Sequence, residues 1–262
     1  MNNWRVYPLT FADQQQHIDV STQLLQTTSP DDRPTLYWSQ AEPSALVLGF
    51  SQKESILNAK TLRQQPIPIY HRHAGGTAVL VGAHLLSLDV VLPAGHPLLL
   101  PDVVESYRWF GEAWIAALAL LGIQTRTVPP AEAHAQRDLL KQPETRAYES
   151  LMHRACYGTL SSYEVVVGTR KIVGLDMIRR RNGSLLQAGV LLHWDTTVLA
   201  QLLGHTTEEQ ELLRTGLIER AIGLDVIAGH SVTANEVIAA FEQVIQTLPY
   251  THDTHNHTSV IH

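Results

Sequence analysis

Three strand-like segments follow one another within residues 155–189, and they constrain the fold more than any other stretch of the chain. The segments lie at residues 162–167, 171–174 and 184–192. Gly168-Thr169 forms a tight turn after the first segment, and Asn182-Gly183 is a strong two-residue hairpin signal before the third. The pattern predicts a meander of neighbouring strands, so a β-sheet forms at least part of the fold.

This stretch holds the only cysteine of the chain, Cys156, and the lysine Lys171, which we place on neighbouring strands. A thiolate is a strong nucleophile that a nearby cation stabilises, so Cys156 is a candidate nucleophile and Lys171 its candidate partner. A lone cysteine is, however, more often a small buried hydrophobe. Lys171 can equally be a solvated strand residue that pairs with Glu164. The residues alone leave both interpretations open.

Length and charge predict a globular, cytoplasmic protein. With 262 residues, of which 44% are hydrophobic, the chain can bury a substantial core. A net charge of −6 argues against general binding to nucleic acid or to an anionic membrane. A single cysteine suits a reducing compartment, and the N-terminus lacks the apolar run of a signal peptide. The longest apolar run, residues 114–123, is about half a membrane span.

No internal repeat or linker divides the chain, so we expect one domain over residues 1–250 and a flexible tail over 251–262. The tail contains four histidines, namely His252, His255, His257 and His262. Thr, Asn and Ser separate these histidines, which indicates a frayed end. No metal site is therefore predicted.

A second candidate feature is the loop at Gly75-Gly76, which follows a strand ending at Arg72 and precedes an apolar strand at 78–81. Adjacent glycines allow a backbone to approach a ligand closely, and an arginine at such a loop can pair with a carboxylate or phosphate. A plain hairpin turn explains the same residues equally well. The chain has no P-loop or GxGxxG pattern.

The remaining segments predict mainly helices. The clearest helix covers residues 101–122, where an aromatic stripe at helical spacing indicates core packing. Residues 129–150 are rich in Pro, Ala and Glu and are predicted to be a mobile loop, a place for a lid because it leads into Cys156. Other expected helices lie at residues 11–27, 195–203, 207–222 and 232–247.

Taken together, these pieces resemble the catalytic-domain family of biotin and lipoate protein ligases, and most of all its cysteine-type octanoyltransferases of lipoyl assembly. The match extends over most of residues 35–245. Four stretches carry it: Arg72-His73-Ala74-Gly75-Gly76-Thr77-Ala78-Val79; Glu105-Ser106-Tyr107-Arg108 with the helix that follows; Cys156-Tyr157 with Ser161 and Tyr163-Glu164; and Lys171-Ile172-Val173-Gly174 with Gln187 and Gly189.

The resemblance implies an α/β (α+β) fold in which helices pack on a mixed β-sheet and a tunnel holds an acyl chain. It assigns catalysis to Cys156 and Lys171. The implied substrate-binding residues are Arg72, Gly75, Gly76, Thr77, Ala78 and Gly174. Backbone N–H groups near Gly75-Gly76 or Lys171 are expected to hold the developing oxyanion, and Val79 and Leu88 are expected to line the acyl slot.

The implied reaction moves an octanoyl or lipoyl group from a carrier-protein thioester, through acyl-Cys156, to a lysine of a lipoyl domain. It uses no cofactor. The implied partners are acyl carrier protein and the lipoyl domains of 2-oxoacid dehydrogenases or glycine cleavage protein H. Lys171 is expected to stabilise the thiolate or, if burial lowered its pKa, to take a proton from the attacking amine.

Some positions depart from the family pattern. Leu175 and Met177 stand where the transferases usually carry Ser and Gln, so acyl specificity and activity are the properties that these changes affect. The other departures are His73, Thr77, Leu160 and Ala188.

Two alternatives stay open. One is a lipoate ligase that makes an acyl-adenylate from ATP and Mg²⁺ and uses Lys171 at the activated carboxyl, although adenylate chemistry does not need a thiol. The other is a non-catalytic protein that binds lipoyl domains or acyl carriers. A biotin ligase fits less well, because residues 72–76 lack the longer glycine–arginine loop of that branch.

Overall fold

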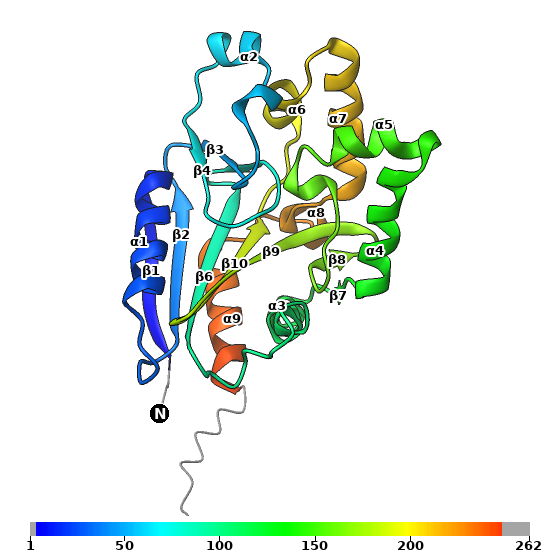
Figure 1. Ribbon diagram of the computed structural model, residues 1–262. Coiled ribbons are helices and arrows are strands. Elements are labelled where there is room, and N and C mark those ends of the chain that lie inside the picture. The colour runs from blue at the N-terminus through cyan, green and yellow to red at the C-terminus, as the bar shows by residue number, and fades with distance from the viewer. Residues whose placement is uncertain (1–3, 248–262) are drawn as a thin grey trace, which may run out of the picture.

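Within residues 4–247, the part of the chain that the computed structural model describes, the strands form two sheets (Figure 1). The larger sheet has the order β1-β2-β6-β10-β9-β8-β7. Its strands are β1 (Arg5–Ala12), β2 (Thr35–Ala41), β6 (Leu85–Pro93), β10 (Gly183–Leu191), β9 (Arg170–Arg180), β8 (Val165–Val167) and β7 (Arg126–Thr127). Strands β1 and β2 are parallel and the other neighbours are antiparallel, so the predicted mixed sheet and the predicted β8-β9-β10 meander are both confirmed.

The smaller sheet contains β4 (Ile69–His71), β3 (Ala45–Leu48) and β5 (Val79–Val81), in that order. Strand β3 is parallel to β4 and antiparallel to β5. The strands on either side of Gly75-Gly76 are therefore not partners of each other, and the interpretation of these glycines as a plain hairpin turn is wrong. The loop instead crosses from one side of β3 to the other.

Helices cover both faces of the larger sheet. Helix α1 (Gln14–Thr27) packs against β2, β6 and β10 on one face, whereas α3 (Arg108–Leu120) and α9 (Ala234–Thr247) pack together on the other (Figure 1). The other helices are α2 (Ala59–Gln64), α4 (Pro130–Asp138), α5 (Pro143–Met152), α6 (Thr197–Leu203), α7 (Thr207–Arg220) and α8 (Leu224–Ala228). None of the helices in the described residues is long and apolar enough to cross a membrane.

The main core lies between the sheet and the α3–α9 pair. Its centre is aromatic: Trp38 of β2, Phe110 and Trp114 of α3, and Phe241 of α9 are all fully buried. The rings of Trp114 and Phe241 lie 4.3 Å apart between centroids, and large apolar rings in such contact contribute strongly to core stability. The aromatic stripe predicted for this helix is thus part of the core.

The two-residue period of the strands separates this core from the opposite face. On β6, Leu86, Leu88 and Val90 point into the main core, so Ser87 and Asp89 point toward α1. The prediction that Leu88 lines an acyl slot is therefore wrong, because Leu88 lies on the face that α3 and α9 cover.

The structure differs from the sequence predictions at three other places. Residues 129–150 form α4, a 3-10 turn at Leu139–Lys141 and α5, not a mobile loop, because Pro130 and Pro143 occupy first helical positions, where a missing N–H is tolerated. The helix expected at 101–122 begins only with a 3-10 turn at Glu105–Tyr107. Strand β1 was not predicted, because it contains Pro8, and such strands lie at sheet edges.

The three helices expected after the meander are present as α6, α7 and α9, with the short α8 between the last two. The four histidines of the predicted tail, His252, His255, His257 and His262, lie outside the described residues.

Candidate active site

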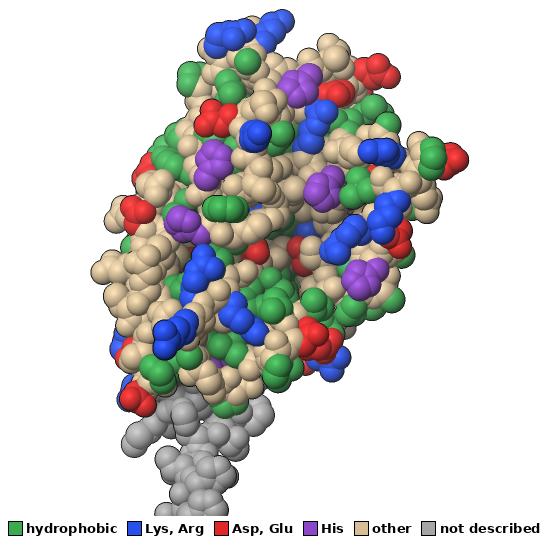
Figure 2. Space-filling model, viewed as in Figure 1, with side chains coloured by type: hydrophobic (Ala, Val, Ile, Leu, Met, Phe, Trp, Pro, Cys, Tyr) green, Lys and Arg blue, Asp and Glu red, His purple; other side chains and the backbone are tan. Residues whose placement is uncertain are grey.

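A cavity of about 580 Å³ opens between the two sheets, in the size range of small-molecule sites. Its lining comes from β2, β6, β9 and β10 of the larger sheet, from β3 and β5 of the smaller sheet, and from α1. Figure 2 shows this face of the molecule, which is hollowed near its centre, with Lys and Arg side chains around the hollow. Of the predicted site residues, Arg72, Gly76, Thr77, Cys156, Lys171 and Gly174 line the cavity, and Gly75 and Ala78 do not.

Cys156 opens a single 3-10 turn, Cys156–Gly158, shortly after α5 ends at Met152, so the prediction that it lies on a strand is wrong. Its backbone N–H donates to the carbonyl of Ala78 at 2.8 Å, and the N–H of Ala78 donates to the carbonyl of Arg154 at 3.1 Å. This backbone bridge joins the Cys156 turn to Ala78 at the rim of the smaller sheet. Burial raises the pKa of the Cys156 thiol, and the charges of Lys171 and Arg72 oppose that rise.

Lys171 lies on β9 below this turn and is only 1% exposed. Its Nζ donates to both carboxylate oxygens of Glu164, at 2.7 and 2.8 Å, and to the carbonyl oxygen of Cys156 at 2.9 Å. The predicted partner is therefore in contact with the backbone of Cys156. The interpretation of Lys171 as a solvated strand residue is wrong, although its pairing with Glu164 is observed.

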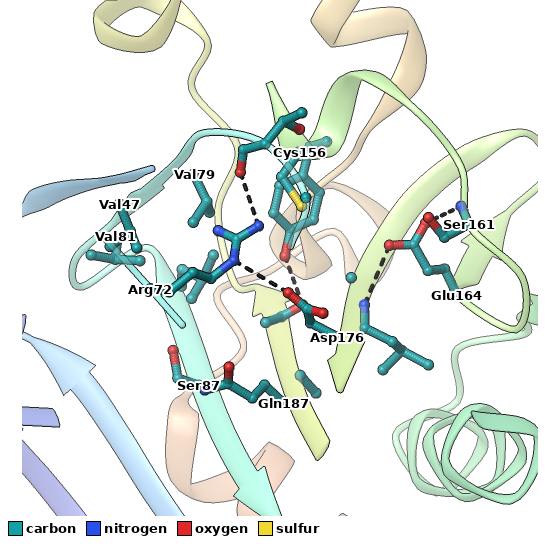
Figure 3. A pocket seen from close by; sticks show the side chains of 18 of the residues that line it. Val47, Arg72, Val79, Val81, Ser87, Cys156, Ser161, Glu164, Asp176 and Gln187 are labelled. Atoms are coloured by element: carbon teal, nitrogen blue, oxygen red, sulfur yellow. Dashed lines mark hydrogen bonds and ion pairs between the residues drawn. The ribbon is translucent and has the colours of Figure 1, made fainter. Parts of the chain in front are cut away.

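Glu164 is as deeply buried as the lysine, at 2% exposed. It also accepts the N–H groups of Ser161, at 2.6 Å, and Leu175, at 3.3 Å. Burial raises the pKa of the Glu164 carboxyl, and the charge of Lys171 opposes that rise. Two protein amides and one ammonium thus hold this carboxylate in a fixed place, and Figure 3 shows its contact with Ser161.

The Arg72 side chain is hydrogen-bonded to the backbone of the loop that follows it. Its Nε donates to the carbonyl of Gly75 at 2.9 Å and to the carboxylate of Asp176 at 3.2 Å, and its Nη2 donates to the carbonyl of Thr77 at 3.1 Å (Figure 3). Asp176 lies on β9, so this contact ties the loop to the larger sheet. Burial raises the pKa of the Asp176 carboxyl, and Arg72 opposes the rise.

Glycine at position 76 is required by geometry. Its φ is +85°, and a Cβ there would lie 2.5 Å from Nη2 of Arg72. A Cβ on Gly49, at the end of β3, would lie 2.0 Å from the carbonyl oxygen of Gly76, so the loop packs directly on that backbone. A Cβ on Gly75 would meet nothing within 4 Å.

Gly174 lies beneath the ring of Tyr157 and has no side chain there. It is the register partner of Gly189 on β10, and the Tyr157 hydroxyl donates to the Gly189 carbonyl at 2.7 Å. A Cβ on Gly174 would lie 3.6 Å from the Tyr157 ring, and one on Gly189 would lie 2.9 Å from its hydroxyl oxygen. The two glycines therefore leave room for this buried ring beside Cys156.

Sequence reasoning did not assign several residues that the structure brings to the cavity. Glu164 and Asp176 were not assigned to the site, and neither was a polar group at the opposite end of the cavity, Ser21, Asp89 and Gln187. One signal for that group was available, because Asp89 is a charged residue inside the otherwise apolar strand LLSLDVVLP. Of the two departures Leu175 and Met177, only Leu175 lines the cavity, and both pack against the main core.

Asp89 is a buried carboxylate with two side-chain partners. The hydroxyl of Ser21 on α1 donates to one of its oxygens, and Nε2 of Gln187 on β10 donates to the other at 2.9 Å. Burial raises the pKa of Asp89 to about 6, against the lowering effect of both hydrogen bonds.

Asp89→Asn is expected to change how stability depends on pH. Between pH 3.8 and about 6 the folded protein holds a proton on Asp89 that the unfolded chain has lost, so stability falls as the pH rises through this window. The free energy of unfolding of the wild type should decrease by about 3 kcal/mol relative to the variant across this window, and the difference should stay constant above it. Urea denaturation of both proteins between pH 4 and 8 measures this, and parallel curves would contradict it.

Comparisons with known proteins identify the family of the chain. Residues 13–246 match the family described as lipoyl protein ligase A/B catalytic domain. The chain belongs to this family. It is 30% identical over 212 residues to the octanoyltransferase LipM of an Exiguobacterium species, covering 80% of this chain and 73% of that protein. It is 27% identical over 210 residues to the octanoyltransferase LipM of Lysinibacillus sphaericus, covering 79% and 72%.

The solved structures agree on the fold. The bipartite lipoate protein ligase of Thermoplasma acidophilum superposes with a TM-score of 0.72 at 17% identity, over 93% of this chain and 82% of that one. A lipoate-protein ligase A bound with ATP superposes with a TM-score of 0.66 at 18% identity, over 92% and 83%. The predicted fold, family and octanoyltransferase branch are confirmed, and so is the prediction that this family member is a transferase enzyme.

Proposed function

We propose that this protein transfers an octanoyl group in lipoyl assembly, through a thioester formed on Cys156. The single observation that carries the proposal is the position of the chain's only cysteine. Cys156 lines a cavity with an apolar wall, and the buried Lys171–Glu164 pair lies directly against its backbone. The names of the similar octanoyltransferases support the same activity.

The first step exchanges one thioester for another. The Cys156 sulfur attacks the carbonyl carbon of the octanoyl donor, a carbon–sulfur bond forms, and the donor thiolate leaves and takes up the proton that Cys156 releases. Since burial raises the pKa of Cys156, the thiol is mostly protonated at neutral pH and must lose its proton during the attack. The positive charges of Lys171 and Arg72 favour the thiolate as it forms.

The second step makes an amide. A lysine amine of the lipoyl domain attacks the acyl-Cys156 carbonyl, the carbon–nitrogen bond forms, and the Cys156 thiolate leaves and recovers a proton from the amine. Neither step needs a metal, a nucleotide or a redox group, so we propose no cofactor. As donor and acceptor we propose acyl carrier protein and the lipoyl domains of 2-oxoacid dehydrogenases or of glycine cleavage protein H, in the cytoplasm.

Lys171 is better placed to provide charge than to move protons. An ammonium has three N–H donors, and Nζ has three oxygen contacts, two on Glu164 and one on Cys156. These contacts hold the positive charge close to the reacting thioester and fix the turn that carries the nucleophile. Proton transfer by Lys171 would require it to leave Glu164, so we assign it an electrostatic and positioning role.

Both tetrahedral intermediates carry an oxyanion that needs donors. The N–H groups of Cys156 and Ala78 are already used in the backbone bridge. Within residues 4–247, the N–H groups of Gly76 and Thr77 have no acceptor, and both residues line the cavity beside Cys156. We assign the oxyanion to these two groups, in line with the expectation for the Gly75-Gly76 loop.

Intact-mass spectrometry tests the proposal. Mixing the protein with octanoyl-loaded acyl carrier protein should add one octanoyl group, which peptide mapping should place on Cys156 and which a lipoyl domain should then remove. If no adduct forms but ATP, Mg²⁺ and lipoate modify the lipoyl domain, the protein is the alternative lipoate ligase. If nothing is modified under either condition, it is a binding protein.

A further inference from the structure

Arg220 is the last residue of α7, and its guanidinium reaches the turn that carries Cys156. Its Nη1 donates to the carbonyl oxygen of Gly158 at 2.8 Å and to Oε2 of Glu149 at 3.0 Å, and its Nη2 donates to Oε1 of Glu149 at 2.6 Å. The side chains of Arg220 and Glu149 are 18% and 6% exposed. A planar fork bound to both oxygens of a buried carboxylate is held in one orientation, so its third bond fixes the position of the Gly158 carbonyl.

The same end of α7 also pairs with the strand that carries Lys171. The N–H of Ile222 donates to the carbonyl of Lys171 at 3.0 Å, and Lys171 and Ala221 form a parallel β-bridge. Three consecutive residues, 220–222, therefore bind both the turn of the nucleophile and the backbone of its counter-charge. This segment joins the two groups independently of the bond between Nζ of Lys171 and the Cys156 carbonyl.

The bonds that Lys171 and Arg220 make to the turn differ in stiffness. Nζ of Lys171 lies at the end of a flexible stem, so it can follow the Cys156 carbonyl over a short distance, whereas a planar guanidinium held by a carboxylate cannot. The turn is also packed closely on α5, because a Cβ on Gly158 would lie 2.1 Å from the carbonyl oxygen of Met152, where that helix ends. Helix α5, helix α7 and the Cys156 turn thus meet at one largely buried ion pair.

The ion pair is not itself part of the cavity. Within residues 4–247, neither Arg220 nor Glu149 lines the cavity, so an acyl chain bound there does not touch the pair. The charges that act on the thiol come from four other residues: Lys171 and Arg72 favour the thiolate, and Glu164 and Asp176 disfavour it. Any effect of the pair on Cys156 must therefore come from where it holds the turn.

We propose that Arg220, held by Glu149, is a positioning residue that keeps Cys156 against Lys171 during acyl transfer. The sulfur must reach a thioester carbonyl in the cavity while the charge of Lys171 stays close to it, and a displacement of about 1 Å can cost about a hundredfold in rate. The inference rests on the proposed function, because it takes Cys156 to be the nucleophile.

The test is the double variant Arg220→Met/Glu149→Met, which removes both charges and leaves neither buried without its partner. The kcat for octanoyl transfer should fall by about tenfold to a hundredfold, with the KM for the loaded carrier protein nearly unchanged. Because Cys156 is the only cysteine, alkylation by iodoacetamide, followed by intact mass, reports on the same thiol without an acyl donor. Its rate at pH 7.5 should fall by about tenfold, since the thiolate forms further from the charge of Lys171.

Arg126→Met/Glu132→Met is the matched control. Arg126 also makes two bonds to one glutamate, Glu132, at 2.8 and 2.9 Å, and a third to a glycine carbonyl, that of Gly168, at 3.0 Å. Since this pair does not bond to the Cys156 turn, both rates should stay at their wild-type values. The conservative variant Arg220→Lys keeps the charge beside Glu149 without the planar fork, and it should also lose about tenfold in kcat.

Circular dichroism at the assay temperature confirms that each variant compared is folded. A wild-type alkylation rate in both Arg220 variants would overturn the positioning role and leave the pair as a brace between α5 and α7. If the wild type forms no octanoyl adduct, the proposed function has failed, but the alkylation rates still decide whether Arg220 positions the thiol.

Discussion

Lys171→Met is expected to lower the free energy of unfolding by about 3–5 kcal/mol and to reduce octanoyl transfer by about a thousandfold. The stability loss follows because the variant leaves the Glu164 carboxylate buried without its counter-charge, which is the costly way to break a buried ion pair. The loss of transfer follows because the thiol keeps the pKa rise caused by burial and loses the positive charge that opposes it. Urea denaturation and single-turnover acyl transfer measure the two effects.

The double variant Lys171→Met/Glu164→Gln separates structure from chemistry. The amide of Gln carries no charge, and its single oxygen can still accept the N–H of Ser161 or that of Leu175, which bond to different oxygens of Glu164, so part of the lost stability should return. Transfer should stay low, because the positive charge near Cys156 is still missing. A double variant that regains both stability and transfer would show that Lys171 only supports the fold.

Cys156→Ser should reduce transfer by about ten-thousandfold, the order of loss seen when an enzyme nucleophile is removed. A serine hydroxyl is far harder to ionise than a thiol, and within the described residues no histidine is hydrogen-bonded to the side chain at position 156. Stability should change by less than about 1 kcal/mol, because the substitution is nearly isosteric and the side chain is only half-buried. Thermal unfolding therefore serves as the control, and a stable, fully active variant would contradict the acyl-Cys156 pathway.

The pH dependence of the wild type gives a second check on Cys156. Burial raises the pKa of the thiol above its ordinary value of 9.0, so adduct formation should still increase as the pH passes 9. A rate that levels off near pH 7 would mean that the cations near Cys156 outweigh burial.

Local patterns in the sequence predicted the fold where neighbouring residues decide it. The meander of β8, β9 and β10 depended on two turns, and Gly168 and Asn182-Gly183 specify those turns by themselves. The placement of β3 between β4 and β5 depends on long-range pairing, which no local signal carries. The same applies to α4 and α5, because prolines at helix starts and prolines in loops look alike in composition.

In the candidate site, too, some residues could be predicted from the sequence and others depend on the folded structure. The residues of the motifs, Cys156, Lys171 and Arg72, were located from spacing and resemblance. Glu164 and Asp176 escaped notice as site residues because an acidic residue on a strand is ordinary until its burial and its partner are known. The polar group of Ser21, Asp89 and Gln187 could be suspected only from Asp89, because its members come from α1, β6 and β10 and meet only in the folded protein.

The division of the cavity lining among separate elements has a consequence for how such an enzyme can change over time. The proposed chemistry depends on Glu164, on Lys171 of β9 and on the turn at Cys156, whereas another part of the cavity is lined by β2, β6 and α1. Mutations in the second group can alter which chain is accepted without touching the nucleophile or its counter-charge. If the proposed function holds, we therefore expect acyl specificity and acyl transfer to be separable traits, of which one can diverge while the other is kept.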